Sequence, residues 1–96
     1  MPAYLIAEIE VVDPAGWAEY VRLVPATIER YGGRYIARGG AVETLEGEPS
    51  PGRVAIVEFA DIRRVHEWLD SPEYRPVRDI RLRTAKSRLR IVEGLG

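Results

Sequence analysis

The chain has 96 residues, a formal net charge of −1 at pH 7 and no cysteine. Its length predicts a single domain over residues 1–96, because each of two separate cores would be too small to be stable without disulfides or metal. The lack of cysteine excludes disulfides, thiol nucleophiles and Cys-ligated metal sites, and the slightly acidic balance argues against a nucleic-acid partner. No stretch is typical of a signal peptide or a membrane span, so we expect a cytoplasmic protein with no membrane partner.

The first third of the chain predicts a strand and then a helix. Residues 4–12 alternate between an apolar face and a mixed face, which is typical of a strand. Asp13 followed by proline is typical of a helix start, and apolar residues then recur at steps of three and four up to about residue 31. We expect Pro25 to kink this helix and the glycines at 32–33 to end it.

The middle of the chain has strand character on both sides of a turn. Residues 34–38 predict a strand, which residues 41–47 resume after a bulge or bend at glycines 39–40. Residues 53–60 are apolar on both faces except at Glu58. This pattern predicts a strand in the centre of a sheet.

The last third predicts two helices and a final strand. Asp61 begins a helix, "DSPEY" at 70–74 breaks it, a separate helix runs from about 76 to 86, and residues 87–94 form the last strand. The order strand, helix, strand, strand, helix, strand predicts an α+β, ferredoxin-like βαββαβ fold, with a four-stranded antiparallel sheet covered by helices on one face. The other face is too apolar to be left in water, so we expect a homodimer in which two sheets pack face to face.

The segment "RYGGRYIARGG" at 30–40 has four glycines and three arginines. RNA-binding segments of this composition are repeated and disordered, whereas this one occurs once and is flanked by strand positions. A phosphate-binding loop needs glycines between a strand and a helix, which is not the pattern here. We therefore interpret the glycines as structural, with Arg38 beside them available to point into a pocket.

Five motifs occur in order over nearly the whole chain: "AEIEVVDP" at 7–14, "YGGRYIARGG" at 31–40, "VEFAD" at 57–61, "DSPEY" at 70–74 and "IVEG" at 91–94. Together they resemble the uncharacterised family named "domain of unknown function 1330". The resemblance implies a dimeric α/β barrel of the ferredoxin-like type, and it implies no established activity and no catalytic residues. The same architecture is similar to that of cofactor-free monooxygenases, muconolactone-type isomerases and ligand-sensing domains of transcription regulators, which is an analogy of fold alone.

Two functions remain open from the sequence. The first is a dimer that binds a small anionic or aromatic molecule and, as an enzyme, acts on it without a cofactor. The alternative is a non-catalytic regulatory or structural dimerisation module. A cavity of about 300 Å³ or more, lined by convergent polar groups, favours the first function, and a filled core with every charge paired favours the second.

Aromatic residues are numerous for so small a core, and most of them are expected to pack in it. The same residues are expected to line a cavity between the sheet and the helices, which suits an aromatic or planar ligand. They are Tyr4, Trp17, Tyr20, Tyr31, Tyr35, Trp68 and Tyr74. Tyr74 follows the "SPE" turn, so we expect it at the pocket mouth, where it would orient the ligand.

The polar residues of the candidate site are two bases and two acids. Arg38 is expected to hold an anionic group of the ligand, and either Glu58 or His66, the only histidine, is expected to move a proton. No metal is expected, because a lone histidine is a poor metal site, and no cofactor is expected either. Glu8 is a further ligand-binding candidate: with Glu58 it forms either a carboxylate pair in a partly dry cavity or separate ion pairs with arginines such as Arg38 or Arg90.

Overall fold

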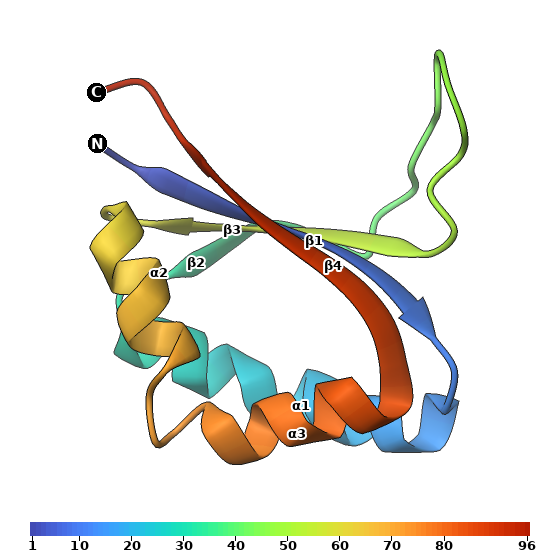
Figure 1. The fold of residues 1–96 in the computed structure, drawn as a ribbon, viewed down its shortest axis with the longest axis horizontal. Helices are drawn as coiled ribbons and strands as arrows, with labels where there is room; N and C mark the ends of the chain where they lie inside the picture. Colours follow the sequence, from blue (N-terminus) through green and yellow to red (C-terminus); the bar gives the residue numbers. More distant parts are fainter.

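The computed structural model describes residues 1–96 and consists of one sheet with helices on one of its faces (Figure 1). The elements are β1 (Ala3–Val11), α1 (Pro14–Arg30), β2 (Arg34–Arg38), β3 (Arg53–Phe59), α2 (Ile62–Leu69), α3 (Arg75–Thr84) and β4 (Ala85–Glu93). The strands lie in the order β2-β3-β1-β4, and all three pairs are antiparallel. This is the predicted ferredoxin-like arrangement, with the second helical segment divided into α2 and α3 as expected. None of these helices is both long enough and apolar enough to cross a membrane.

The helix starts follow from the predicted caps. The carboxylate of Asp13 accepts a hydrogen bond from the backbone N–H of Gly16, and that of Asp61 accepts one from the N–H of Arg64. Each bond satisfies an N–H group that has no partner within the helix. α1 then continues through Pro25 to Arg30, before Gly32 turns the chain with φ of 79°.

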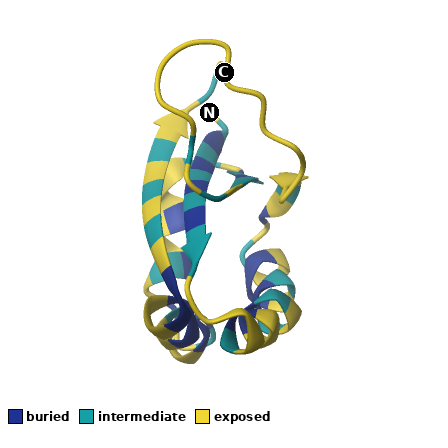
Figure 2. Ribbon diagram, turned by 90° about the vertical axis from the view of Figure 1, so that its right-hand side faces the viewer, coloured by how far each residue is buried: buried dark blue, intermediate teal, exposed yellow.

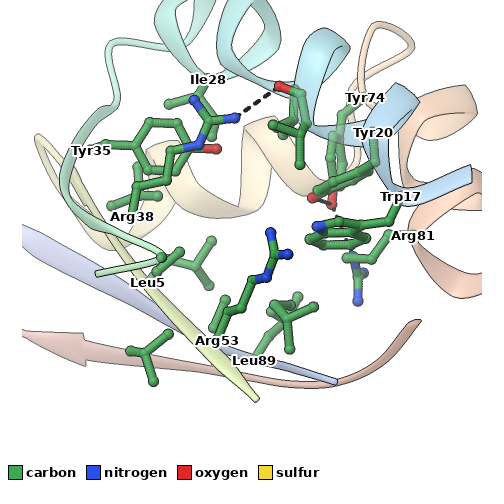
Figure 3. A pocket seen from close by; sticks show the side chains of 18 of the residues that line it. Leu5, Trp17, Tyr20, Ile28, Tyr35, Arg38, Arg53, Tyr74, Arg81 and Leu89 are labelled. Carbon is green, nitrogen blue, oxygen red and sulfur yellow. Dashed lines mark hydrogen bonds between the residues drawn. The ribbon is translucent and has the colours of Figure 1, made fainter. Parts of the chain in front are cut away.

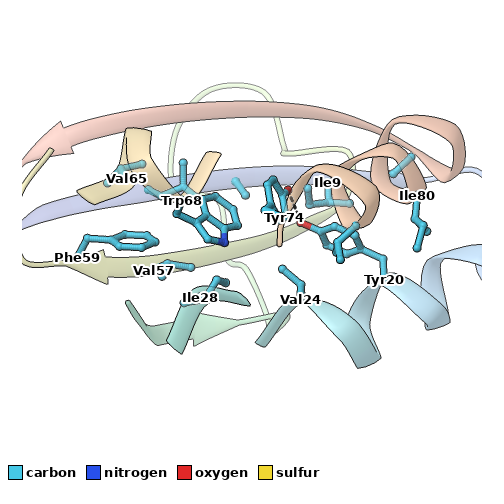
Figure 4. Close-up of a cluster of buried hydrophobic side chains, with 14 of the residues drawn as sticks. Ile9, Tyr20, Val24, Ile28, Val57, Phe59, Val65, Trp68, Tyr74 and Ile80 are labelled. Carbon is cyan, nitrogen blue, oxygen red and sulfur yellow. Dashed lines mark hydrogen bonds between the residues drawn. The ribbon is translucent and has the colours of Figure 1, made fainter. Parts of the chain in front are cut away.

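The inner face of the sheet and the three helices enclose the core. Alternate residues of β1 point inward and are buried, which is the period of two expected of a strand with one covered face. Figure 4 shows the Trp68 ring between Phe59 and Tyr74, with ring centroids 5.8 and 4.0 Å apart. The indole N–H of Trp68 donates to the hydroxyl of Thr27, so this buried polar group is satisfied.

The predicted second strand is shorter than expected and contains its own bulge. Residues 41–47 form no strand, because Gly39 takes a left-handed conformation (φ 68°) that turns the chain away from the sheet. The bulge lies not at the glycines but between Tyr35 and Ala37, where the register with β3 shifts by one residue. The strand therefore changes parity, and Tyr35 and Arg38 both face inward.

The loop of residues 39–52 rises on the side of the sheet opposite the helices, as Figures 1 and 2 both show. Two of its apolar side chains, Val42 and Leu45, are exposed. The open face of the sheet also carries apolar side chains, namely the half-buried Ile6 and Ile56 and the exposed Val92. This side of the molecule therefore presents apolar side chains to solvent beside its charged residues.

Gly52 is required where the loop returns to the sheet. A Cβ atom built on Gly52 would lie 1.9 Å from the backbone oxygen of Ile9, on the neighbouring strand β1. We expect Gly52→Ala to lower the free energy of unfolding by about 1–3 kcal/mol, because the strands would have to move apart. Gly40→Ala is the control: open space surrounds Gly40, so this change should leave stability unaltered or raise it slightly. Chemical denaturation of both variants tests the prediction, and equal stabilities would contradict it.

Candidate functional site

A cavity of about 260 Å³ lies between the inner face of the sheet and the helices (Figure 3). All four strands and all three helices contribute to its wall, and fifteen of its nineteen lining residues are hydrophobic. The other four are Gly39, Arg38, Arg53 and Arg81, so the lining contains three bases and no acid. The cavity therefore combines an apolar wall with a surplus of positive charge.

Aromatic side chains form much of this wall. Five of the seven aromatic candidates line the cavity: Trp17, Tyr20, Tyr35, Trp68 and Tyr74. The rings of Trp17 and Tyr20 are stacked, with centroids 4.6 Å apart. Such flat walls suit a planar ligand.

Tyr74 lies in the cavity wall and not at the mouth, where the sequence placed it. It is completely buried, because the turn before it is held by Ser71, whose hydroxyl accepts from the Tyr74 backbone N–H. This turn directs the ring inward, against Trp68 and Tyr20. Tyr74 thus contributes its hydroxyl group to the interior of the cavity.

A chain of hydrogen bonds joins three of the lining residues. The hydroxyl oxygens of Tyr20 and Tyr74 are 2.8 Å apart, and Nε of Arg81 donates to the Tyr74 hydroxyl over 3.2 Å. Nη1 of Arg81 donates to the hydroxyl of Ser87 on β4. Burial, together with the neighbouring Tyr74, raises the pKa of the Tyr20 phenol far above its ordinary value, so Tyr20 remains a neutral hydrogen-bonding group.

Arg81 is buried without an acidic partner. Only 6% of its surface is exposed, and none of the ion pairs in the structure includes it. Its two hydrogen-bond acceptors, Tyr74 and Ser87, are neutral hydroxyl groups. A buried cation is normally paired with an anion, because removing it from water is costly. Arg81 is thus an unneutralised charge in an apolar wall.

Arg38 lies at the mouth of the cavity and is held in place by α1. Its Nη2 donates to the backbone oxygen of Val21 over 2.8 Å (Figure 3). Pro25 has no N–H and cannot form the helical bond to that oxygen, so Pro25 leaves the acceptor free for Arg38. The guanidinium also lies 4.6 Å from the ring centroid of Tyr35. The predicted orientation of Arg38 toward a pocket agrees with this geometry.

Glu8 and Glu58 lie on the opposite face of the sheet and do not line the cavity. β1 and β3 are neighbours as expected, but the period of two turns both carboxylates outward. Glu8 forms ion pairs with Arg90 at 2.6 Å and Arg88 at 3.3 Å, and Glu58 pairs with Arg34 at 2.8 Å. These arginines lower the pKa of each carboxyl group. Of the two sequence alternatives, the structure has the separate ion pairs.

His66 is an exposed residue of α2 outside the cavity lining. The buried stripe of α2 consists of Val65 and Trp68, and His66 lies one position away from it. No group of three or more possible metal ligands is present in the structure. Because neither His66 nor Glu58 lines the cavity, neither can transfer a proton to or from a molecule inside it.

Sequence reasoning missed Arg81, although a signal was available. The residues of α3 that follow Val77 at helical spacing of three and four positions are buried. They are Ile80, Arg81 and Thr84. An arginine on an apolar helical stripe is unusual, because long charged side chains normally reach solvent. The segment contains several other arginines, and this made the buried position of Arg81 difficult to distinguish from the exposed ones.

Comparisons with known proteins agree with this architecture. The chain is similar in structure to a protein of unknown function from Rhodopseudomonas palustris, with a TM-score of 0.79, 23% identity and coverage of 99% of this chain and 83% of that one. It is similar to SnoaB, a cofactor-independent oxygenase from Streptomyces nogalater (TM-score 0.66, 14% identity, 99% and 94% coverage). It is also similar to a protein from Mycobacterium tuberculosis (TM-score 0.59, 16% identity, 100% and 97% coverage). The sequence matches none of the curated proteins.

At these identities the likeness shows the fold, which is that of the dimeric α/β-barrel proteins, and it carries no residue roles. The sequence itself matches a family model over residues 2–95, and the family is described as a domain of unknown function. The chain therefore belongs to the family DUF1330, as its five motifs predicted.

Proposed function

We propose that the protein binds a small, largely apolar, anionic molecule in the cavity between the sheet and the helices. The observation that carries this proposal is the buried guanidinium of Arg81, which has neutral partners only. Two of its five N–H groups are used in these bonds, so the side chain retains donors for an anion. An anionic group in the cavity would neutralise Arg81 and offset the cost of its burial.

The size and the walls of the cavity support a small ring compound as the ligand. The cavity of about 260 Å³ is slightly smaller than the range for ligand pockets, which begins at roughly 300 Å³, so it limits the ligand to a small molecule. Stacked aromatic rings on α1 and an aliphatic sheet face leave a space with flat, apolar sides. These features favour an aromatic or alicyclic body with one charged group.

Binding, and not proton transfer, is the function that the cavity supports. Glu58 and His66, which the sequence offered as proton-transfer groups, lie outside the lining, and Glu8 is held by arginines on the other face. Arg38 and Tyr74 remain as proposed ligand contacts, Arg38 at the mouth and Tyr74 inside. The likeness to SnoaB supports the fold and adds no catalytic group.

We also propose that the protein is a homodimer whose sheets meet at their open faces. Its relatives in structure are dimeric α/β-barrel proteins, which supports this assembly. The open face carries apolar side chains together with both acids and arginines, so two copies could match apolar area and opposite charges by a twofold axis. The loop of residues 39–52 rises on the same side and would add contacts at its exposed Leu45.

The role of Arg81 is tested by replacing its charge. We expect Arg81→Met to weaken the binding of benzoate or 2-naphthoate by about tenfold to a hundredfold, because a charged hydrogen bond contributes roughly 1.5–3 kcal/mol. The thermal midpoint should stay the same or rise, since an unpaired buried charge is removed. Arg83→Met, an exposed change on the same helix, is the control and should leave binding intact. Calorimetric titration measures the affinities, and unchanged binding in Arg81→Met would refute the proposed role.

The homodimer is tested by charging its proposed interface. We expect the protein to sediment at twice the mass of the chain and Ile56→Arg to sediment as a monomer, because the new charge would be buried against apolar groups. Leu82→Arg changes an exposed apolar residue of α3, away from the sheet face, and should remain dimeric. Analytical ultracentrifugation provides the measurement. A monomeric unaltered protein would exclude the assembly.

The attachment of Arg38 to α1 is tested by a double-mutant cycle. Arg38→Met should lower the free energy of unfolding by roughly 1 kcal/mol, because the Val21 oxygen loses its partner. In a Pro25→Ala background the new N–H can bond to that oxygen, so the same change should cost close to nothing. Chemical denaturation of the four proteins gives the coupling. An equal cost in both backgrounds would show that Arg38 does not replace the missing helical bond.

A further inference from the structure

The inner end of the cavity is formed by Trp17, Tyr20, Tyr74 and Arg81, whose contacts follow one another. The indole of Trp17 stacks on the Tyr20 ring, the Tyr20 hydroxyl bonds to that of Tyr74, and Tyr74 accepts from Arg81. Figure 3 shows these four residues together at one end and Arg38 with Tyr35 at the other. The hydrogen-bonding groups of these four residues therefore lie close enough to act on one ligand group.

The two tyrosines always leave one hydroxyl hydrogen without a protein acceptor. Tyr20 and Tyr74 together have two hydroxyl hydrogens, and only one of them can lie in the bond between the two oxygens. Arg81, the other neighbour of Tyr74, is a donor and cannot accept the second hydrogen. Whichever tyrosine donates, the pair retains a hydrogen that can be donated to a ligand.

Trp17 supplies a second unused donor. Its side chain is 7% exposed, and its Nε1 is buried without a hydrogen-bond partner in the protein. In Figure 3 the indole extends from α1 into the cavity, with the nitrogen at its inner edge. The other tryptophan, Trp68, also lines the cavity, but its N–H is bonded to Thr27. An indole N–H can only donate, so the free N–H of Trp17 requires an acceptor.

We infer that the inner end of the cavity receives the carboxylate of an aromatic or alicyclic acid, with the indole N–H of Trp17 as the donor that selects it. The inference rests on the proposed function and specifies the class of ligand. A carboxylate has two oxygens and accepts only, which matches an end that offers an indole N–H, a phenol hydrogen and a guanidinium. Alcohols, amides and protonated acids bring hydrogens of their own, which only the tyrosine oxygens can accept, so these ligands match the set of donors less well than a carboxylate does.

The two indole N–H groups make this inference directly measurable. In ¹⁵N-labelled protein they give two separate signals, one from Trp17 and one from Trp68. Benzoate and 2-naphthoate are titrated against benzamide, the neutral analogue of benzoate. We expect the carboxylates to shift the Trp17 indole signal strongly and that of Trp68 only weakly, because Trp68 is already bonded to Thr27. Benzamide should bind at least about tenfold more weakly than benzoate.

A variant separates the donor from the ring. Trp17→Phe keeps an aromatic ring in the wall and removes the N–H, and we expect it to lower benzoate affinity about tenfold and to reduce the preference for benzoate over benzamide. Tyr31→Phe removes a hydroxyl that donates to Glu73 outside the cavity, and it should bind benzoate as the unaltered protein does. The signal of the unaltered protein decides the question even if Trp17→Phe does not fold.

The outcomes distinguish this inference from the proposed function. If benzoate shifts the signals of cavity residues but leaves the Trp17 indole signal and the Trp17→Phe affinity unchanged, the cavity binds anions and the role of Trp17 is overturned. Equal affinity for benzoate and benzamide would overturn the selection of carboxylates in the same way. If neither carboxylate at millimolar concentration shifts any signal of the cavity, the proposed function fails together with the inference.

Discussion

The period of two along each strand is the constraint on which the rest of this structure depends. It gives the sheet one face for the helices and the cavity and another for apolar residues and ion pairs. Glu8 and Glu58 lie on the second face because of their positions in the alternating pattern of β1 and β3. Their side chains therefore cannot act in the cavity. Arg38 is the exception to this alternation. The bulge at Tyr35–Ala37 shifts the register of β2 by one residue, so the side chain of Arg38 faces the cavity.

The helical layer adds a polar chain to an otherwise apolar interior. Tyr20 comes from α1, Tyr74 from the turn before α3 and Arg81 from α3, so the chain of hydrogen bonds connects elements that are distant in sequence. A buried network of this kind is costly unless every donor is satisfied. The surplus of donors in the cavity is a cost to stability, which the ligand proposed above would offset.

Local sequence signals predicted most of the fold. The site was harder to predict, because it depends on which residues of different elements lie close together in space. Asp13 and Asp61 as caps, the glycines after α1 and the break at 70–74 depend on neighbouring residues, and all were confirmed. The strand expected at 41–47 was wrong, because an apolar pattern does not form a strand when the chain has turned away from its partner. The position of Arg81 on the buried stripe of α3 could be read from the sequence, but its lack of an acidic partner could not. The free N–H of Trp17 could not be found from sequence either, since the significance of both groups depends on which partners are missing around them in space.

The bulge in β2 also affects how the molecule can associate. β2 is an edge strand, and a regular edge offers unpaired backbone groups to the strands of other chains. The bulge interrupts this row, and the strand is only five residues long, with an arginine at each end. Such an edge is a poor template for adding further strands, so the β2 edge of the sheet is protected against growth into continuous sheets.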